Sequence, residues 1–171
     1  MPDQVLPADI DETPRRDEVP RLYAERMAQE KAAAATTKAP GHYILAADTV
    51  VALGRRILPK AETPDEVRAC LSLLSGRRHH VITAVVLLSP GGGRSARTVD
   101  TGVVFARLAR DDIEDYALSA EGLGKAGGYA IQGHAAAFVR LLSGSYTGVV
   151  GLPLYETVAL LRGRGYRMPG A

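Results

Sequence analysis

The sequence predicts an α/β protein in which helices pack on a mixed sheet, and three observations support this fold class. Helix-capping signals and amphipathic segments occur between runs of apolar and β-branched residues. Two pairs of strand-like runs are separated only by short glycine-containing turns, which is typical of hairpins and not of strict βαβ alternation. The 171 residues are 46% hydrophobic, enough for a sizeable core. We therefore expect one domain spanning residues 1–171.

The N-terminal part is expected to be extended and then helical. Pro7 restricts residues 3–10 to an edge or irregular strand, and the acidic turn at residues 11–14 follows. Residues 18–35 predict a helix, because apolar residues are spaced among charged ones and Pro20 is tolerated in the first turn. Lys31 lies near the end of this expected helix, where the helix dipole alone would favour a cation.

An acid lies inside the next apolar segment, residues 44–54, which predicts a largely buried strand. Asp48 must therefore be hydrogen-bonded, paired or metal-bound, because burying a bare carboxylate is costly or raises its pKa. Lys60 follows a glycine-marked turn, so the chain can fold back and place its ammonium near Asp48. An acid that caps a turn, together with a surface lysine, would explain the same spacing.

The middle of the chain predicts a helix and a hairpin. Thr63 and Glu66 form a capping box with a proline at the first helical position, and Gly76 ends that helix. Residues 79–88 predict a buried strand that turns at the glycines near residue 92 into a second strand ending near residue 109. His79 and His80 should point to opposite faces and not share one metal ion.

The C-terminal part predicts two more helices and a second hairpin. The helices are expected at residues 111–120 and 153–161, and residues 138–142 should pair with residues 146–150. Residues 122–127 match the letters of a dinucleotide-binding fingerprint. We reject that match, because a helix precedes the glycines and the strand-like residues 129–132 follow them. A loop that lets backbone approach a ligand, or a simple connection, is expected instead.

Composition argues against several classes of partner. The net charge is only +2 and 5% of residues are aromatic, so a nucleic-acid partner is not expected. Cys70 is the single cysteine and shares a helical apolar face with Val67, Leu71 and Leu74, which indicates a core position. Without a charged-then-apolar leader or a long apolar run, we expect a soluble cytoplasmic protein with no membrane association.

Seven short motifs, in order from about residue 3 to 166, together resemble the Maf family of nucleoside triphosphate pyrophosphatases, also called septum formation inhibitor proteins. The motifs are residues 11–14 (Asp-Glu-Thr-Pro), 30–32 (Glu-Lys-Ala), 47–51 (Ala-Asp-Thr-Val-Val), 54–60, 74–83 (Leu-Ser-Gly-Arg, with His79, Val81 and Thr83), 127–133 (Gly-Gly-Tyr-Ala-Ile-Gln-Gly) and 148–156. The resemblance implies the elongated mixed α/β fold shared with inosine triphosphate pyrophosphatases.

The resemblance also implies the chemistry. Family members hydrolyse a nucleoside triphosphate between the α and β phosphates with a divalent cation, Mg²⁺ or Mn²⁺, and a homodimer is suggested. Asp48 matches the proton acceptor, and Asp48 and Glu12 would supply the hard oxygen ligands that such a metal prefers. Lys31 and Lys60 match the phosphate-binding lysines, and point cations suit the charge that builds on phosphate oxygens.

Thr49 and Gln132 match positions that separate the dTTP/UTP branch of the family from other branches. The amide of Gln132 carries a donor and an acceptor, which can meet the O4 acceptor and the N3 donor of uracil or thymine, in canonical or modified pyrimidine nucleotides. A polar residue at a strand end would be the simpler explanation of Gln132.

This sequence departs from the family pattern in two places. Family members begin with a strand and a Ser-Pro-Arg-Arg loop, which the sequence beginning at Met1 lacks, and Arg15 and Arg16 follow the acidic motif and do not replace it. Ala61 follows Lys60, where the family usually has proline. Weak or absent turnover is therefore expected. The alternative to a dTTP/UTP pyrophosphatase is a nucleotide-binding regulator of cell division and septum formation.

Overall fold

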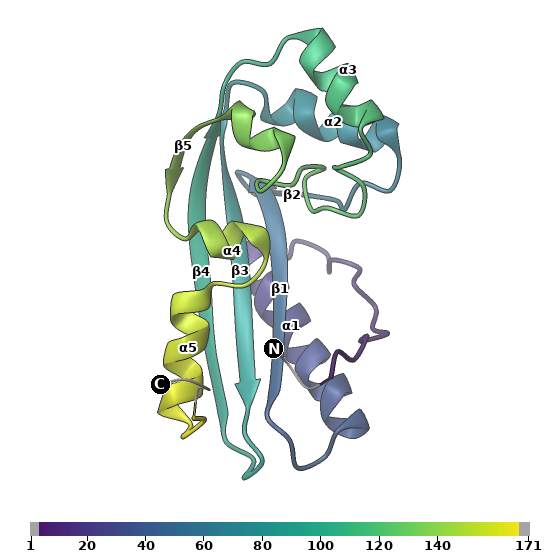
Figure 1. Cartoon of the computed structure of the whole chain (residues 1–171). Helices are drawn as coiled ribbons and strands as arrows, with labels where there is room; N and C mark the ends of the chain where they lie inside the picture. Colours follow the sequence, from purple (N-terminus) through teal and green to yellow (C-terminus); the bar gives the residue numbers. More distant parts are fainter. Residues whose placement is uncertain (1–3, 168–171) are drawn as a thin grey trace.

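The computed structural model describes residues 4–167, which form an elongated molecule built along a long sheet (Figure 1). In chain order the elements are α1 (Pro20–Lys38), β1 (Ile44–Leu53), β2 (Arg56–Leu58), α2 (Pro64–Leu74), β3 (Arg78–Leu88), β4 (Arg94–Phe105), α3 (Arg110–Leu118), the 3₁₀ helix η1 (His134–Phe138), β5 (Val139–Ser143), α4 (Tyr146–Val150) and α5 (Leu154–Gly163).

The sheet has the strand order β2-β1-β3-β4-β5. The long β1–β3 pairing runs from Ile44 opposite Leu88 to Ala52 opposite His80, and β3 and β4 form the expected hairpin. The predicted combination of helices packed on a sheet is confirmed. All four pairings between the described strands are antiparallel, however, so the expectation of mixed strand directions is not met.

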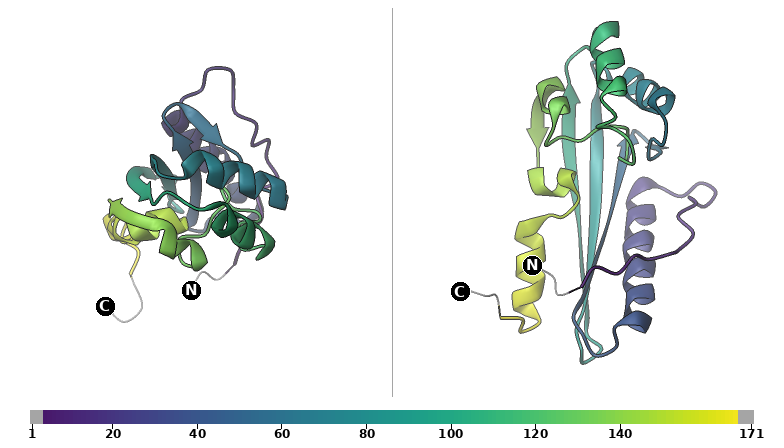
Figure 2. Two further views of the ribbon diagram at one scale, coloured as in Figure 1. Left: turned by 90° about the horizontal axis from the view of Figure 1, so that it is seen from above. Right: turned by 45° about the vertical axis from the view of Figure 1, so that its right-hand side comes forward.

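The helices cover the two faces of the sheet, as Figures 1 and 2 show. Ala24, Ala28 and Ala32 of α1 pack against one face of β1 and β3, and these small residues let the helix approach closely. Leu160 of α5 packs on the opposite face, against Val85 and Leu87 of β3. Because side chains alternate between the faces of a strand, the neighbours Asp48 and Thr49 of β1 point to opposite sides of the sheet.

A third apolar cluster joins α2, α3 and the loop after α3 at one end of the sheet. Cys70 is buried there, as its helical spacing predicts. The capping box of α2 is also confirmed, since the Thr63 hydroxyl accepts from the Glu66 amide and the Glu66 carboxylate accepts from the Thr63 amide, both at 3.3 Å. The cap fixes where α2 starts, and Phe105 of β4 closes the cluster from the sheet.

Residues 4–19 form no strand, so the expected edge strand at residues 3–10 is wrong over the described residues 4–10. Pro7 has no N–H group to give to a strand ladder. Side chains of α1 bind this segment instead. Tyr23 donates to the Glu12 carbonyl at 2.8 Å, and Lys38 donates to the Pro7 carbonyl at 2.7 Å. These contacts place Glu12 beside α1.

Three expectations in the second half of the chain also need correction. Residues 129–132 are irregular at 129–130 and a turn at 131–132, and they do not form a strand. The expected hairpin at residues 138–150 has a strand only in its first half, because Ser145 accepts from the Gly148 amide at 3.0 Å and starts the short helix α4. The strand β4 ends at Phe105 and not near residue 109, because Ala109 already precedes the first turn of α3.

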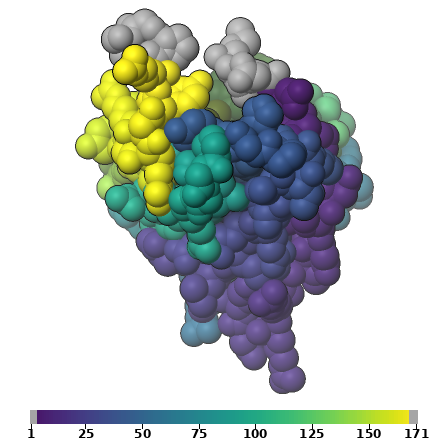
Figure 3. Space-filling model, turned by 90° about the horizontal axis from the view of Figure 1, so that it is seen from below, coloured from purple at the N-terminus to yellow at the C-terminus, as the bar shows by residue number. Residues whose placement is uncertain are grey.

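At the far end of the sheet, the C-terminal helix lies against the turn between β3 and β4 and against the segment before β1 (Figure 3). Arg164 donates to the Ser95 hydroxyl at 2.7 Å, and Tyr43 donates to the Arg164 carbonyl at 2.9 Å. These contacts hold the end of α5 on the sheet, well away from the cavity described next.

None of the helices found in residues 4–167 is long and apolar enough to cross a membrane.

Candidate active site

Four charged side chains form a continuous chain of ion pairs beside β1. The Lys31 ammonium lies 2.6 Å from Asp48 Oδ1 and 2.8 Å from Glu12 Oε1. The Lys60 ammonium lies 2.6 Å from the other Glu12 oxygen. The structure therefore brings together the two acids and two lysines singled out in the sequence. Lys31, and not Lys60, is the direct partner of Asp48, and Lys60 joins the cluster through Glu12.

Regular elements and one irregular segment position these side chains. Asp48 lies on the face of β1 that packs against α1, and Lys31 reaches it from that helix. The helix continues to Lys38, so Lys31 is not in its last turn and the helix dipole does not account for its position. Glu12 comes from the irregular N-terminal segment, and Lys60 follows β2. Four separate parts of the chain thus meet at one point.

Burial and ion pairing act in opposite directions on the pKa values of the cluster. Only 5% of the Asp48 side chain is exposed, and this burial raises the pKa of its carboxyl group, although the Lys31 ammonium opposes the shift. Burial acts in the same direction on Glu12, but hydrogen bonds from Lys31 and Lys60 outweigh it and lower the pKa of Glu12. Burial would lower the pKa of Lys31, yet its two carboxylate partners raise it. Asp48 is therefore the acid best suited to accept a proton.

Two adjoining cavities open beside this cluster. One, of about 230 Å³, is lined by Lys31, Asp48 and Lys60 and extends to Gln132. The other, of about 320 Å³, is lined by Glu12 and Tyr23 and shares Asp48 and Lys60 with the first. Within the described residues β1 pairs with β2 only from Val51 onward, so the strand edge at residues 48–49 lies open to both cavities.

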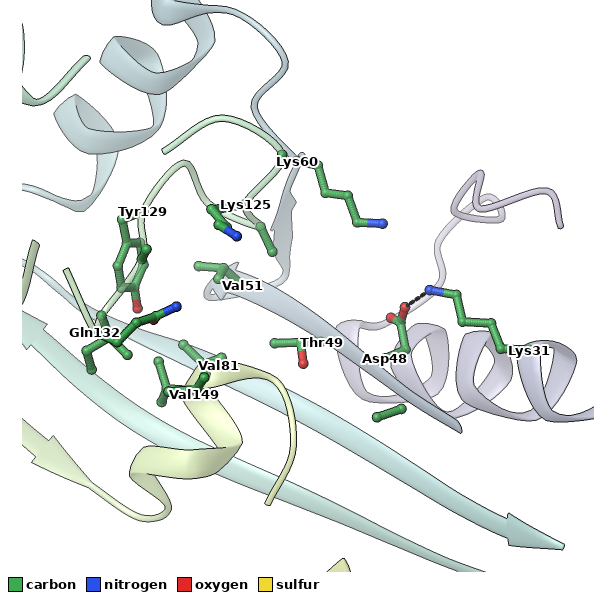
Figure 4. Close-up of a pocket in the computed structure, with 16 residues that line it drawn as sticks. Lys31, Asp48, Thr49, Val51, Lys60, Val81, Lys125, Tyr129, Gln132 and Val149 are labelled. Carbon is green, nitrogen blue, oxygen red and sulfur yellow. Dashed lines mark hydrogen bonds and ion pairs between the residues drawn. The ribbon is translucent and has the colours of Figure 1, made fainter. Parts of the chain in front are cut away.

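Gln132 lies at the opposite end of the first cavity from Asp48 and Lys31, and Thr49 lies between the two ends (Figure 4). The Thr49 hydroxyl lies 2.8 Å from the Thr83 hydroxyl, which donates to the Gly148 carbonyl at 2.7 Å. Because a hydroxyl has one proton, Thr49 must be the donor to Thr83, and its own oxygen remains an acceptor. The cavity therefore has a charged end and an uncharged polar end.

The family model described as Maf-like protein matches residues 1–164 of this sequence. This chain belongs to the Maf family. It is 58% identical over 166 residues to a protein of Caulobacter vibrioides named dTTP/UTP pyrophosphatase, and the match covers 97% of this chain and 86% of the relative. Proteins of the same name from Mesorhizobium japonicum and Rhodospirillum rubrum are 58% and 57% identical, over 98% and 99% of this chain and 83% and 80% of theirs.

One charged residue of this Maf site, Lys125, was not predicted from the sequence. It lines the first cavity together with Lys31 and Lys60, so three of the four lysines in the chain border one cavity. The Lys125 ammonium makes no hydrogen bond or ion pair with the rest of residues 4–167. The glycine-rich loop that contains Lys125 was the one sequence feature that pointed to the site, because such a loop was expected to let backbone approach a ligand.

The carboxylates of the Maf site fit a divalent cation that a substrate helps to hold. Asp48 and Glu12 both contact the Lys31 ammonium, so their oxygens lie close enough to approach one ion. No cluster of three or more metal-ligating side chains is found in residues 4–167. Mg²⁺ typically uses one or two carboxylates together with substrate phosphates, which matches this pair. His79 and His80 are separate from it: His79 is buried, and His80 pairs with Asp100 at 2.7 Å.

Proposed function

We propose that this Maf protein hydrolyses dTTP and UTP to the nucleoside monophosphate and pyrophosphate. The observation that carries the proposal is a single cavity with a buried acid and two lysines, Lys31 and Lys60, at one end and Gln132 at the other (Figure 4). A triphosphate needs the charged end and a pyrimidine base needs the uncharged polar end. The names of the relatives from Caulobacter vibrioides and Mesorhizobium japonicum support the same substrates.

The charged end would carry the reaction. Asp48 would orient a water molecule and accept its proton as the bond between the α and β phosphates breaks. Lys31 and Lys60 would stabilise the negative charge that builds on the phosphate oxygens. Asp48 and Glu12 would hold a Mg²⁺ or Mn²⁺ ion, which supplies further neutralisation of phosphate charge when bound. In the free protein Glu12 already bridges the two lysines, which keeps both ammonium groups together before substrate arrives.

The polar end would read the base. The Gln132 amide offers one donor and one acceptor group to the O4 and N3–H of uracil or thymine. The Thr49 hydroxyl oxygen is a second acceptor lining the cavity, and either it or the Gln132 oxygen would accept from N3–H, the one donor on that edge. Cytosine presents the opposite donor and acceptor pattern on that edge, so it would pair only with a Gln132 amide rotated by 180°, and discrimination against cytosine requires the amide to keep one orientation.

Gln132→Leu should reduce the preference for UTP over CTP and GTP while triphosphate binding persists. Leaving the polar edge of the base unpaired typically costs about 1–3 kcal/mol, so the ratio of kcat/KM values should fall roughly tenfold or more. The measurement is pyrophosphate release with each nucleotide. Gln29→Leu, the same change on α1, serves as a control that should leave the ratio unchanged. An unaltered ratio in Gln132→Leu would refute base reading by this residue.

Lys60→Ala should weaken binding of every accepted nucleotide to a similar extent, because a contact to phosphate cannot distinguish bases. A lost charge-assisted hydrogen bond is worth about 1.5–3 kcal/mol, so KM should rise roughly tenfold or more for both UTP and dTTP. Lys38→Ala is the matched control, because Lys38 is the one lysine outside the cavity and binds the Pro7 carbonyl. Losses that differ strongly between bases would contradict a phosphate role for Lys60.

A further inference from the structure

Two side chains outside the cavity bind the backbone on either side of Gln132. The Ala130 amide donates to the Tyr116 hydroxyl at 3.0 Å. The same hydroxyl donates to Glu121 Oε1 at 3.0 Å. The other Glu121 oxygen accepts from the His134 amide at 3.1 Å. One linked pair of side chains therefore fixes the amide two residues before Gln132 and the amide two residues after it.

The hydrogen bonds of this pair are mutually consistent. Tyr116 is only 3% exposed, and its ring packs edge-on against Phe138 with centroids 5.5 Å apart. A buried phenol has one proton, so a hydroxyl that donates to Glu121 can only accept from the Ala130 amide. Burial would raise the pKa of Glu121, but the His134 amide and the Tyr116 hydroxyl outweigh it and lower that pKa, so the carboxylate is ionised at neutral pH. An ionised carboxylate accepts from two donors at once.

The space beside the loop is also filled. A Cβ atom added to Gly133 would overlap the Glu121 carboxylate, which shows how closely that side chain lies against the backbone next to Gln132. At the other end of the loop, Tyr129 is held through its hydroxyl, 2.8 Å from Nε2 of the buried His79. The segment lacks strand pairing, so these side-chain contacts hold its backbone in place of the hydrogen bonds of a sheet.

We propose that Tyr116 and Glu121 are positioning residues for recognition of the nucleobase. They hold the backbone around Gln132 so that its amide faces the cavity at a fixed depth and angle. The proposal rests on the proposed function, since it takes Gln132 to be the group that reads the base. Hydrogen bonds weaken steeply once distance and angle depart from their narrow optimum, so a loosened loop loses discrimination between bases before it loses the phosphate contacts.

The test compares Tyr116→Phe and Glu121→Gln with the wild-type protein. Phenylalanine keeps the ring and removes the acceptor for the Ala130 amide. Glutamine keeps the size of residue 121 but has only one acceptor oxygen, so it cannot serve both Tyr116 and His134. In each variant we expect the ratio of kcat/KM for UTP over CTP to fall about threefold to tenfold, while kcat for UTP changes less than KM. The dissociation constant for CTP divided by that for UTP, measured in EDTA so that no metal-dependent turnover occurs, should fall in parallel.

Tyr43→Phe is the matched control, because it removes a hydroxyl that binds a backbone carbonyl far from the cavity, that of Arg164. It should leave both ratios unchanged. If Tyr116 and Glu121 had a purely structural role, the variants would have a lower melting temperature and less active protein. The rates with all nucleotides would then fall by the same factor, and the ratios would not change.

Measuring Gln132→Leu in the same series separates the two proposals. If Gln132→Leu changes the ratios and the Tyr116 and Glu121 variants do not, positioning by this pair is overturned and base reading by Gln132 stands. If none of the three variants changes the ratios, base reading by Gln132 fails and the positioning proposal falls with it.

Discussion

Replacing Asp48 with asparagine is expected to lower turnover of UTP by about 100-fold or more while the protein remains folded. Asparagine has nearly the same volume and can still accept the hydrogen bond that Lys31 donates to Asp48 Oδ1. It cannot take a proton from water or offer an anionic ligand to a metal. Because burial disfavours the charged form of Asp48, losing that charge should cost little folding stability.

The measurement is the initial rate of pyrophosphate release at saturating UTP, together with the melting temperature of the variant. Asp100→Asn is a matched control, because Asp100 lies on the same sheet but pairs with His80 and does not line either cavity. It should retain wild-type turnover. A wild-type rate in Asp48→Asn would remove Asp48 from the chemistry.

Replacing Lys31 with methionine should have the second largest effect, and it should depend on pH. The Lys31 ammonium is the main influence that lowers the pKa of Asp48 against burial, and only 18% of the Lys31 side chain is exposed. Removing it should raise the pKa of Asp48 further. A general base acts only when deprotonated, so the acidic limb of the kcat/KM profile should move to higher pH, and activity at neutral pH should fall at least tenfold.

Profiles of kcat/KM against pH for the wild type and Lys31→Met test this expectation, with Lys38→Met as the control. Adding Asp48→Asn to Lys31→Met should cause little further loss, since residues that act as one unit have non-additive effects. An acidic limb that stays in place, or moves to lower pH, would show that Lys31 does not control the protonation of Asp48.

The elements with strong local signals could be predicted from the sequence. The capping box at Thr63, the proline at the start of α1 and the long β-branched run of β3 each specify their element without help from the rest of the chain. The predicted need of Asp48 for a partner was also met, because the cost of burying a carboxylate does not depend on the fold. Which lysine supplies the partner is a matter of tertiary packing, and sequence spacing pointed to Lys60 where the structure has Lys31.

The errors lie where tertiary contacts override local preference. Val149 and Val150 favour a strand, yet Ser145 caps a helix there, and the Thr83 hydroxyl binds the Gly148 carbonyl within it. Residues 129–132 look like a strand, but the Ala130 amide bonds to Tyr116 and not to a neighbouring strand. Lys125 escaped notice because a lysine in a glycine-rich loop carries no periodic signal, and only the folded chain shows that it borders the cavity.

Asp48 and Thr49 are consecutive, and a single peptide unit therefore separates the side chain proposed for catalysis from one proposed for base selection. The pleat of β1 sends one side chain to the ammonium groups and the next to the base end. A shift of β1 by one residue against β3 would move Asp48 and Thr49 each to the opposite face of the sheet. The ion pair with Lys31 and the hydroxyl contact with Thr83 would then be lost together. The nine residue pairs that lock β1 to β3 prevent that shift. Under the proposed function, substitutions at position 49 should therefore change which base is accepted without disturbing Asp48.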